Sequence, residues 1–428
     1  MGSEMCIRDR FRNDLRIIDN LSLNDAIESS DEILFVYMQD VKNLKDTEWK
    51  FTRMGSHRKL YICQGLNALQ EKLSNYGHSL NYYSDNTVDG LLKLVEKFQI
   101  DRIYCESIDS HEELDEEIRL RERKIELYSY YQSGLFLNDQ IPFHLNDLPD
   151  VFTNFRKEIE SRRVKPIKPS PINQKIKTIT SIIDEESITF DIQQKNYSKS
   201  SFPISENRFF GGEDKGFAYL ESYFSSNKPS TYKKTRNELI GIDFSTKFSP
   251  WLASGYISAR QVYDFLLSYE SNVIKNESTY WIFFELLWRE YFRLIFKKYG
   301  KKIFHVHGLG FSDEMVSHSP ENFELWKEGR TGSNFINAGM KELKETGFLS
   351  NRMRQIVASF LVNELSCDWR AGAAWFESQL IDYDVFSNHC NWAYIAGHGT
   401  DPRGGRHFDI KKQKSSYDPN DSYEKLWS

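Results

Sequence analysis

The chain has 428 residues, a net charge of −6 and five scattered cysteines without a C-x-x-C pair. Its length favours two domains, and its acidic total argues against a protein that coats nucleic acid indiscriminately, although a local basic groove can coexist with it. Neither a run of about 18 apolar residues nor a secretory leader is present, which predicts no membrane span. The cysteine pattern indicates a reduced, cytoplasmic protein with no zinc site and no disulfide framework.

Residues 13–136 alternate between short β-rich runs and amphipathic helical patterns. Such alternation predicts an α/β, Rossmann-like domain with a parallel sheet that is covered by helices on both faces. The expected strands are 32–37, 79–83, 102–105 and 125–128, and the expected helices are 58–73, 88–98 and 112–121. Because no G-x-G-x-x-G or G-x-x-x-x-G-K-[ST] motif occurs, a generic dinucleotide or triphosphate site is not supported.

The N-terminus does not fit this pattern. A parallel α/β domain should begin with an apolar strand, yet "MGSEMCIRDR" (1–10) is polar. We therefore expect foreign sequence there, with the first strand missing or replaced, in a domain that spans residues 1–135.

Residues 136–205 are expected to connect two domains. The stretch "RRVKPIKPSPINQKIKT" within them is rich in Lys and Pro and has no sustained period. The following domain, 206–428, is expected to be all-α, with helices 258–270, 278–299, 334–345, 350–365 and 369–381.

Many polar residues interrupt the apolar helical pattern between Thr346 and Trp392. They are Asn351, Arg352, Arg354, Asp368, Arg370, Asp382, Asp384 and Asn388. Buried carboxylates and guanidinium groups are costly unless they are paired or bound to a ligand. A structural ion-pair network is one interpretation. A pocket for a large, flat, polar-edged aromatic ligand is the other, and the nearby tryptophans favour it.

Three other segments supply similar groups. "TYKKTRN" (231–237) is basic and holds a tyrosine, "YWIFFELLWREYF" holds Glu285 and Arg289, and "GIDFSTKFSPWL" clusters hydroxyl groups before a helix. Those hydroxyls suit either a phosphate or a routine helix N-cap.

The segments together carry a family resemblance, in order, from Phe11 to the end of the chain. They are "FRNDLR…DN", "TKFSPWLASGYIS", "FELLWREYF", "WKEGRTG", "TGFLSNRMRQIVASFL", "DWRAGAAWFESQLIDYDVFSNHCNW" and "GTDPRGGRHFDIKKQ…YDP". The sequence resembles the photolyase/cryptochrome superfamily, and specifically cryptochrome DASH. The resemblance implies an α/β antenna domain joined by a long linker to a helical domain that holds U-shaped FAD.

The resemblance also implies the FAD-binding residues. They are Tyr232, Ser245, Thr246, Lys247, Phe248, Ser249, Glu285, Arg289, Asn351, Arg354, Asp382, Tyr383, Asp384 and Asn388. Arg354 paired with Asp382 would hold a charge beside the isoalloxazine ring, and Asn388 would lie near flavin N5.

The implied activity is light-driven splitting of cyclobutane pyrimidine dimers, preferentially in single-stranded DNA, by electron transfer from reduced flavin. The lesion would be flipped out of the base stack, which costs least in single strands. The catalytic residues would be Glu285, which hydrogen-bonds the damaged base, with Trp288, Asn388 and Tyr394. Contacts to DNA are expected from Arg236, Trp288, Asn351, Arg352, Tyr394, Arg403 and Arg406.

Photoreduction in the family commonly uses three tryptophans. Trp392 and Trp369 match the inner two, but the outer position holds Val316. We expect photoreduction to be slowed, or rerouted through Trp326, Trp375 or a tyrosine.

The resemblance further implies a folate antenna, 5,10-methenyltetrahydrofolate, for which Glu106 is the candidate residue. No metal is expected, and the protein is expected to be a monomer. Two other functions remain open: a blue-light signalling receptor, and a DNA- or RNA-binding flavoprotein without repair turnover.

Overall fold

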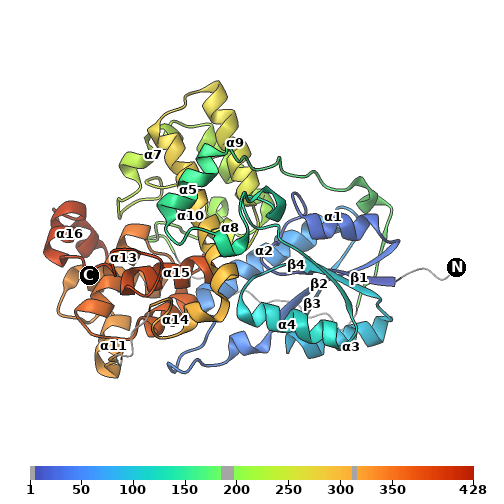
Figure 1. The fold of residues 1–428 in the computed structure, drawn as a ribbon, viewed down its shortest axis with the longest axis horizontal. Coiled ribbons are helices and arrows are strands. Elements are labelled where there is room, and N and C mark those ends of the chain that lie inside the picture. The colour runs from blue at the N-terminus through green and yellow to red at the C-terminus, as the bar shows by residue number, and fades with distance from the viewer. Residues whose placement is uncertain (1–4, 185–196, 311–315) are drawn as a thin grey trace.

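The computed structural model describes residues 5–184, 197–310 and 316–428. They form an α/β domain and a helical domain that lie side by side, with the connecting segment running between them (Figure 1). The predicted fold class is therefore confirmed. Among the described residues, no helix is both long enough and apolar enough to cross a membrane.

The sheet of the α/β domain is parallel throughout, with the strand order β3-β2-β1-β4-β5 and with β6 paired to β2. The strands are β1 (Met5–Phe11), β2 (Glu32–Asp40), β3 (Leu80–Asp85), β4 (Arg102–Glu106), β5 (Glu126–Tyr130) and β6 (Thr180–Ser181). The helices between them are α1 (Leu21–Glu28), α2 (Ser56–Ser74), α3 (Thr87–Phe98) and α4 (His111–Glu122).

Strand β2 shows why helices cover both faces of this sheet. Phe35 and Tyr37 pack with residues of α1 and α2, whereas Leu34 and Val36 pack with residues of α3 and α4. Side chains alternate between faces along a strand, so a continuously apolar strand needs cover on both sides. Figure 1 shows α1 on one side of the sheet and α3 and α4 on the other.

The first strand is not missing, whereas the expectation that residues 1–10 are foreign sequence stays a prediction. Residues Met5–Phe11 form β1, between β2 and β4, with a register shift against β2 between Ile7 and Arg10. The polar sequence is tolerated because the flanking strands supply backbone partners. In addition, the buried Arg10 pairs with Glu116 of α4 at 2.7 Å.

The described residues of the helical domain form twelve α-helices. They are α6 (Glu213–Phe224), α7 (Lys228–Thr235), α8 (Ser249–Ala253), α9 (Ala259–Asn272), α10 (Glu277–Tyr299), α11 (Pro320–Lys327), α12 (Asn334–Thr346), α13 (Asn351–Asn363), α14 (Trp369–Gln379), α15 (Val385–Ala396), α16 (Ile410–Tyr417) and α17 (Ser422–Leu426). One further helix, α5 (Phe152–Ser161), lies within the predicted connector, part of which (185–196) falls outside the described residues. The domain boundaries themselves stay a prediction.

The loop after β1 joins the two domains through buried polar contacts. Asp19 forms an ion pair with Arg260 of α9 at 3.0 Å, and Arg16 donates to the carbonyl of Gly255 at 2.9 Å. Gly255 has φ +69°, and a Cβ there would lie 1.8 Å from the carbonyl oxygen of Asn13. Only glycine allows the two backbones to approach this closely.

Candidate cofactor and substrate site

A cavity of about 570 Å³ in the helical domain lies among α7, the loop before α8, α10, α13 and α15. Its volume is in the range of small-molecule and cofactor sites. The predicted site residues that line it are Tyr232, Arg236, Ser245, Thr246, Lys247, Phe248, Ser249, Glu285, Trp288, Arg289, Asn351, Arg352, Arg354, Asp382, Asp384, Tyr394 and Arg406. Residues from distant parts of the sequence therefore meet at one site.

The start of α13 positions the first charged group. Ser350 caps the helix by accepting from the backbone N–H of Met353. Arg354, one turn later, donates to the carbonyl of Leu349 and to both carboxylate oxygens of Asp382, at 3.0 and 2.9 Å. Ser249 donates to the same carboxylate at 2.6 Å. Asp382 is thus fixed by hydrogen bonds from two separate elements.

Asp384 is held at the start of α15 in a similar way. It caps this helix by accepting from the backbone N–H of Ser387, and it forms an ion pair with Arg293 at 2.8 Å. Burial alone would raise the pKa of Asp384, but Arg293 and Arg289 outweigh it and lower the pKa. The sequence interpretation missed Arg293. Its position, four residues after Arg289 on α10, was the available signal.

Lys247 is the group whose surroundings point most directly to a ligand. The residue is buried with φ +56°, and its ammonium has no hydrogen-bond partner in the described ranges. It lies 3.4 Å from the ring centroid of Phe244 and 4.9 Å from that of Phe348. Burial lowers its pKa well below the usual value. Because an unpaired buried amine is costly, an anion bound in the cavity would relieve that cost.

Glu285 lies in the wall of the cavity on α10 and pairs with Arg236. Burial raises the pKa of Glu285 even though Arg236 acts to lower it. One turn away, Arg289 donates to the carbonyl of Ser133 at 2.6 Å, so a residue of the cavity also contacts the chain that leaves the α/β domain. Burial, followed by Arg293, lowers the pKa of Arg289 to about 10.

Two aromatic walls lie beside Glu285. Trp288 stacks on Phe152 of α5 with 3.7 Å between centroids and meets Tyr394 edge-on at 6.0 Å. The Tyr394 hydroxyl accepts from Arg406 at 2.7 Å and from Arg403 at 3.3 Å. Phe152, which the sequence interpretation placed in the connector, therefore covers one face of Trp288.

Asn388 and Tyr383 do not line the main cavity. They line a smaller adjoining one of about 80 Å³, which shares Asn351, Arg354 and Asp382 with it. Asn388 donates to the carbonyl of Ala373 at 3.0 Å. Tyr383 lies beneath the guanidinium of Arg58 at 4.5 Å, a partner from α2 that the sequence interpretation missed.

Four other predicted residues lie away from the main cavity. Trp392 lines the small cavity, and the buried Trp369 donates to the carbonyl of Val306. The exposed Arg403 pairs with Asp401. Glu106 is buried at the end of β4, where burial raises its pKa to about 7.

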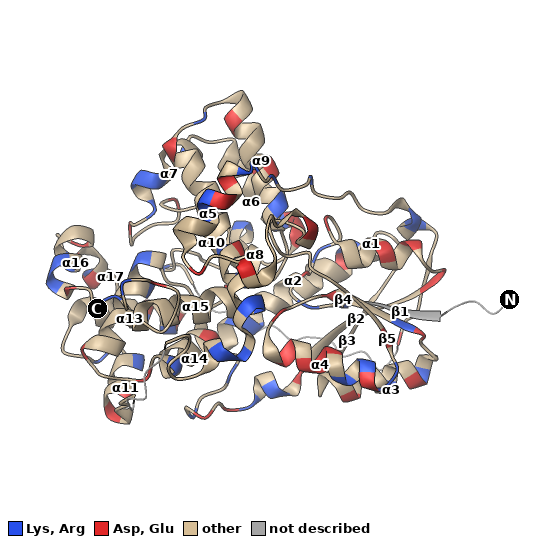
Figure 2. Ribbon diagram, in the orientation of Figure 1, with Lys and Arg blue, Asp and Glu red and all other residues tan. Residues whose placement is uncertain are grey.

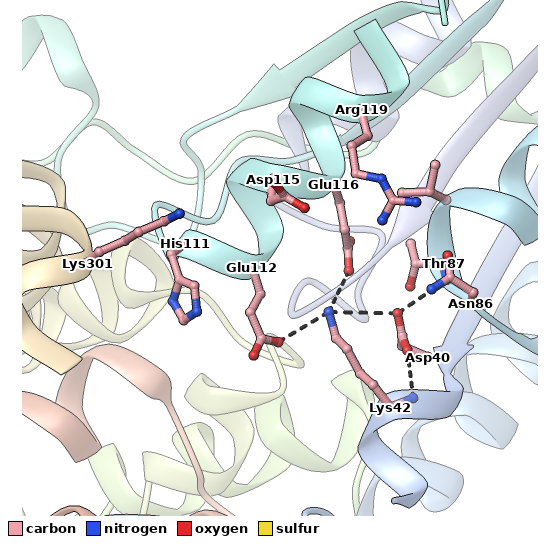
Figure 3. A pocket seen from close by; sticks show the side chains of 11 residues that line it. Asp40, Lys42, Asn86, Thr87, His111, Glu112, Asp115, Glu116, Arg119 and Lys301 are labelled. Carbon is pink, nitrogen blue, oxygen red and sulfur yellow. Dashed lines mark hydrogen bonds and ion pairs between the residues drawn. The ribbon is translucent and has the colours of Figure 1, made fainter. Parts of the chain in front are cut away.

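A second hollow, of about 250 Å³, lies at the carboxyl ends of β2 and β3 and beside the start of α4. Figure 3 shows Lys42 there between Glu112, Glu116 and Asp40, with distances of 3.2, 3.0 and 3.8 Å. Glu106 does not line this crevice. Within the described ranges, we find no cluster of three or more His, Cys, Asp or Glu residues suited to hold a metal ion.

Each of the two domains matches a known protein family. Residues 11–172 match the family model of DNA photolyase, and residues 281–428 match the FAD binding domain of DNA photolyase. Among solved structures, the Synechocystis sp. cryptochrome superimposes with a TM-score of 0.92 at 37% identity, covering 100% of this chain and 89% of that one. A class III photolyase from Agrobacterium tumefaciens, 22% identical with a TM-score of 0.79, shares the fold.

The residues that line the main cavity are suited to FAD, the cofactor named by the family model that matches residues 281–428. The cavity combines apolar walls, fixed carboxylates, arginines and one unpaired lysine, which suit a flavin ring and a diphosphate. Curated relatives cover nearly the whole chain. Cryptochrome DASH of Danio rerio is 39% identical over 97% of this chain and 82% of the relative. That of Xenopus laevis is 40% identical over 99% and 83%. By fold, site and sequence, the chain belongs to the cryptochrome DASH family of the photolyase/cryptochrome superfamily.

Proposed function

We propose that this protein is a light-dependent, FAD-containing lyase that splits cyclobutane pyrimidine dimers, preferentially in single-stranded DNA. The observation that supports this most is Glu285, a partly buried carboxyl group that lines the same cavity as the predicted flavin-binding residues and the aromatic pair Trp288 and Tyr394. Desolvation raises the pKa of Glu285, and in its protonated form this group can donate a hydrogen bond to a base carbonyl.

Reduced FAD, when bound and excited by light, supplies the electron that opens the dimer. The protein's own residues position the lesion. Trp288 is held rigid by Phe152 and Tyr394 by two arginines, so both rings offer fixed surfaces to a flipped base.

The DNA backbone would be held by the cations around the cavity. Arg236 and Arg352 line it, and Arg403 and Arg406 are anchored beside Tyr394 by Asp401. Figure 2 shows further basic positions on α7 and α16. Contacts to phosphates carry no information about base sequence. Single strands are favoured because flipping a base out of them costs the least free energy.

We further propose that the protein acts as a monomer and needs no metal ion. The buried free thiols Cys63, Cys105, Cys367 and Cys390 support a reducing, cytoplasmic setting. A folate antenna at Glu106 stays a prediction, to be checked by folate-dependent near-ultraviolet absorbance in the wild type and in Glu106→Gln.

The test is repair of a thymine dimer in matched single- and double-stranded oligonucleotides by chemically reduced holoprotein with quantified FAD. We expect repair mainly of the single strand. Compared at equal FAD occupancy, Glu285→Ala should lose repair by roughly a hundredfold, as when a preorganised hydrogen-bond donor is removed.

The matched control is Glu277→Gln, an exposed carboxylate on the same helix, which should repair normally. Equal repair of both substrates would contradict the strand preference. Absence of repair at full FAD occupancy would overturn the lyase and favour a blue-light receptor or a flavoprotein that binds DNA or RNA without turnover.

A further inference from the structure

The ion pair between Arg236 and Glu285 conflicts with the role that Glu285 has in the proposed function. Both side chains line the main cavity, and the Arg236 guanidinium donates to the Glu285 carboxylate. A carboxylate that accepts from a guanidinium is ionised and has no proton to donate, whereas a base carbonyl needs a donor. Arg236 must therefore release Glu285 before this group can bind a damaged base in the way proposed.

Arg236 lies where such a release costs little. It is the C-cap residue of α7, and its side chain is 23% exposed. Its guanidinium lies 5.3 Å from the ring centroid of Trp281, and Glu285 is its only ion-pair partner among the described residues. Because an ion pair that solvent reaches contributes little to stability, Arg236 can turn to another anion without disturbing the fold.

A second cation lies at the same rim of the cavity. Arg352 donates to Asn237, the residue after Arg236, at 3.1 Å and to Gln355 at 3.0 Å. It has no carboxylate partner within the described ranges, and burial, with a further contribution from Arg236, lowers its pKa. An anion between the two guanidinium groups would remove this repulsion, and a phosphate suits their forked N–H donors.

We propose that Arg236 is a positioning residue that switches Glu285 from acceptor to donor when the substrate binds. A phosphate of the damaged strand draws Arg236 away from Glu285 toward Arg352, and the Glu285 carboxylate takes up one proton from the solvent as the damaged base covers it. The inference rests on the proposed function, because it concerns the same lesion site. Arg236 keeps its charge throughout, so the solvent supplies the only proton that moves.

The direction of the proton transfer follows from the groups that face Glu285. They are Arg236 and Tyr232 of α7 and the indole of Trp281 on α10. Burial raises the pKa of Glu285, whereas Arg236 and then Trp281 lower it. When Arg236 leaves and the base excludes water, the pKa of Glu285 rises. Binding of the damaged strand is then linked to proton uptake, and its affinity falls as the pH rises above the pKa of Glu285 in the free protein.

The test is calorimetric titration of oxidised holoprotein with a single strand that carries a thymine dimer, in buffers of different ionisation enthalpy. Darkness prevents repair, so the titration reports binding alone. We expect an uptake of up to about one proton per complex, and an affinity that falls by up to about tenfold per pH unit. The same strand without the dimer places no base against Glu285 and should show little uptake. Equal uptake with both strands would overturn the link to the lesion.

Substitutions of Arg236 distinguish a switch from a simple phosphate contact. Arg236→Gln leaves Glu285 unpaired in the free protein, so the proton uptake should shrink and the fall in affinity should move to higher pH. Arg236→Lys keeps a cation that can pair with Glu285 and should retain the uptake. Lys233→Gln is the matched control, because Lys233 lies on the same helix and beside the same indole but pairs with Glu277. It should weaken binding and keep the proton count.

A second readout identifies the group that is protonated. The infrared difference spectrum between free and lesion-bound protein should show the C=O stretch of a neutral carboxyl group, and Glu285→Gln should lack it. Absence of this band or of proton uptake in the wild type would overturn the inference. An Arg236→Gln variant that binds more weakly with an unchanged proton count would overturn it as well, since Arg236 would then be a phosphate contact only.

Binding in the dark separates this inference from the lyase proposal. Proton uptake with the dimer, together with no repair by reduced and illuminated holoprotein, would overturn the lyase and leave the switch standing. Repair without proton uptake would overturn the switch and leave the lyase. A damaged strand that does not bind at all would overturn both.

Discussion

The two hollows of the molecule differ in how their charged groups are satisfied. In the crevice of the α/β domain, Lys42 has carboxylates of Glu116 and Glu112 within 3.2 Å (Figure 3). In the cavity of the helical domain, the buried Lys247 has no hydrogen-bond partner among the described residues. The first amine is paired directly with carboxylates of the protein, whereas the second has carboxylates such as Glu342 nearby but no hydrogen-bond partner among the described residues until a ligand binds.

This difference shows which charges serve folding and which serve binding. Ion pairs that complete themselves, such as Arg10 with Glu116, hold elements together without a ligand. A buried amine that lacks a hydrogen-bond partner is costly to folding, and a ligand anion would explain why it is retained. Three sets of substitutions test this difference between the two hollows.

The largest effect is expected from Asp382→Asn. This carboxylate accepts hydrogen bonds from Arg354 and Ser249, and its loss leaves a mostly buried guanidinium without a counter-charge. We expect the free energy of unfolding to fall by about 3 kcal/mol and FAD binding to weaken. Denaturant unfolding of the apoprotein and fluorescence titration with FAD measure both. Asp214→Asn, at an exposed site, is the control, and an equal loss there would contradict the assignment.

Lys247→Met and Lys42→Met should change stability in opposite directions. Removing Lys247 should raise the free energy of unfolding of the apoprotein by about 1 kcal/mol, since a buried amine without a hydrogen-bond partner disappears. It should also weaken FAD about tenfold. Lys42→Met should lower stability by up to about 1 kcal/mol and leave FAD affinity unchanged. The same sign of stability change in both variants would refute the comparison.

The smallest effect concerns pH. Burial raises the pKa of Glu342 to about 7, where it faces Lys247 and Arg354 and bonds to Tyr423 and Ser201. Between the unfolded pKa of about 4.3 and this value, the unfolded chain releases a proton that the folded chain keeps, so stability falls as pH rises. Glu342→Gln should flatten this decline in unfolding experiments between about pH 5 and pH 8.

The exposed Glu345, on the same helix, provides the matched variant for this measurement. Glu345→Gln should keep the decline. A profile that is unchanged in Glu342→Gln would show that another group causes it.

Much of the fold was predictable because its elements carry strong periodic patterns. The amphipathic stretch 58–73 became α2, and the apolar run 32–37 became β2. Strand β1 was not predictable, because its sequence is polar and lacks an apolar pattern. Its place in the sheet comes from backbone pairing with β2 and β4. The charge of Arg10 is balanced by a helix 106 residues away, which no local pattern reveals.

The site was predictable to the extent that residue type decides it. Closely spaced polar residues in an apolar helical context, such as Arg354 and Asp382, indicated a buried polar pocket, and the structure brings them together. The sequence did not distinguish a paired charge from an unpaired one. The state of Lys247, the stack of Phe152 on Trp288 and the place of Asn388 beside the main cavity depend on long-range packing.

The close backbone contact at Gly255 has a consequence for how a ligand enters. Since the carbonyl of Asn13 lies where a side chain would begin, and Asp19 and Arg260 are locked beside it, a hinge between the domains would break buried bonds. The two domains therefore do not close over the cavity by rotating about this loop. A DNA strand that reaches the cavity must therefore bend or unstack its bases. The free-energy cost of binding then depends on how easily the strand deforms, and not on domain closure of the protein.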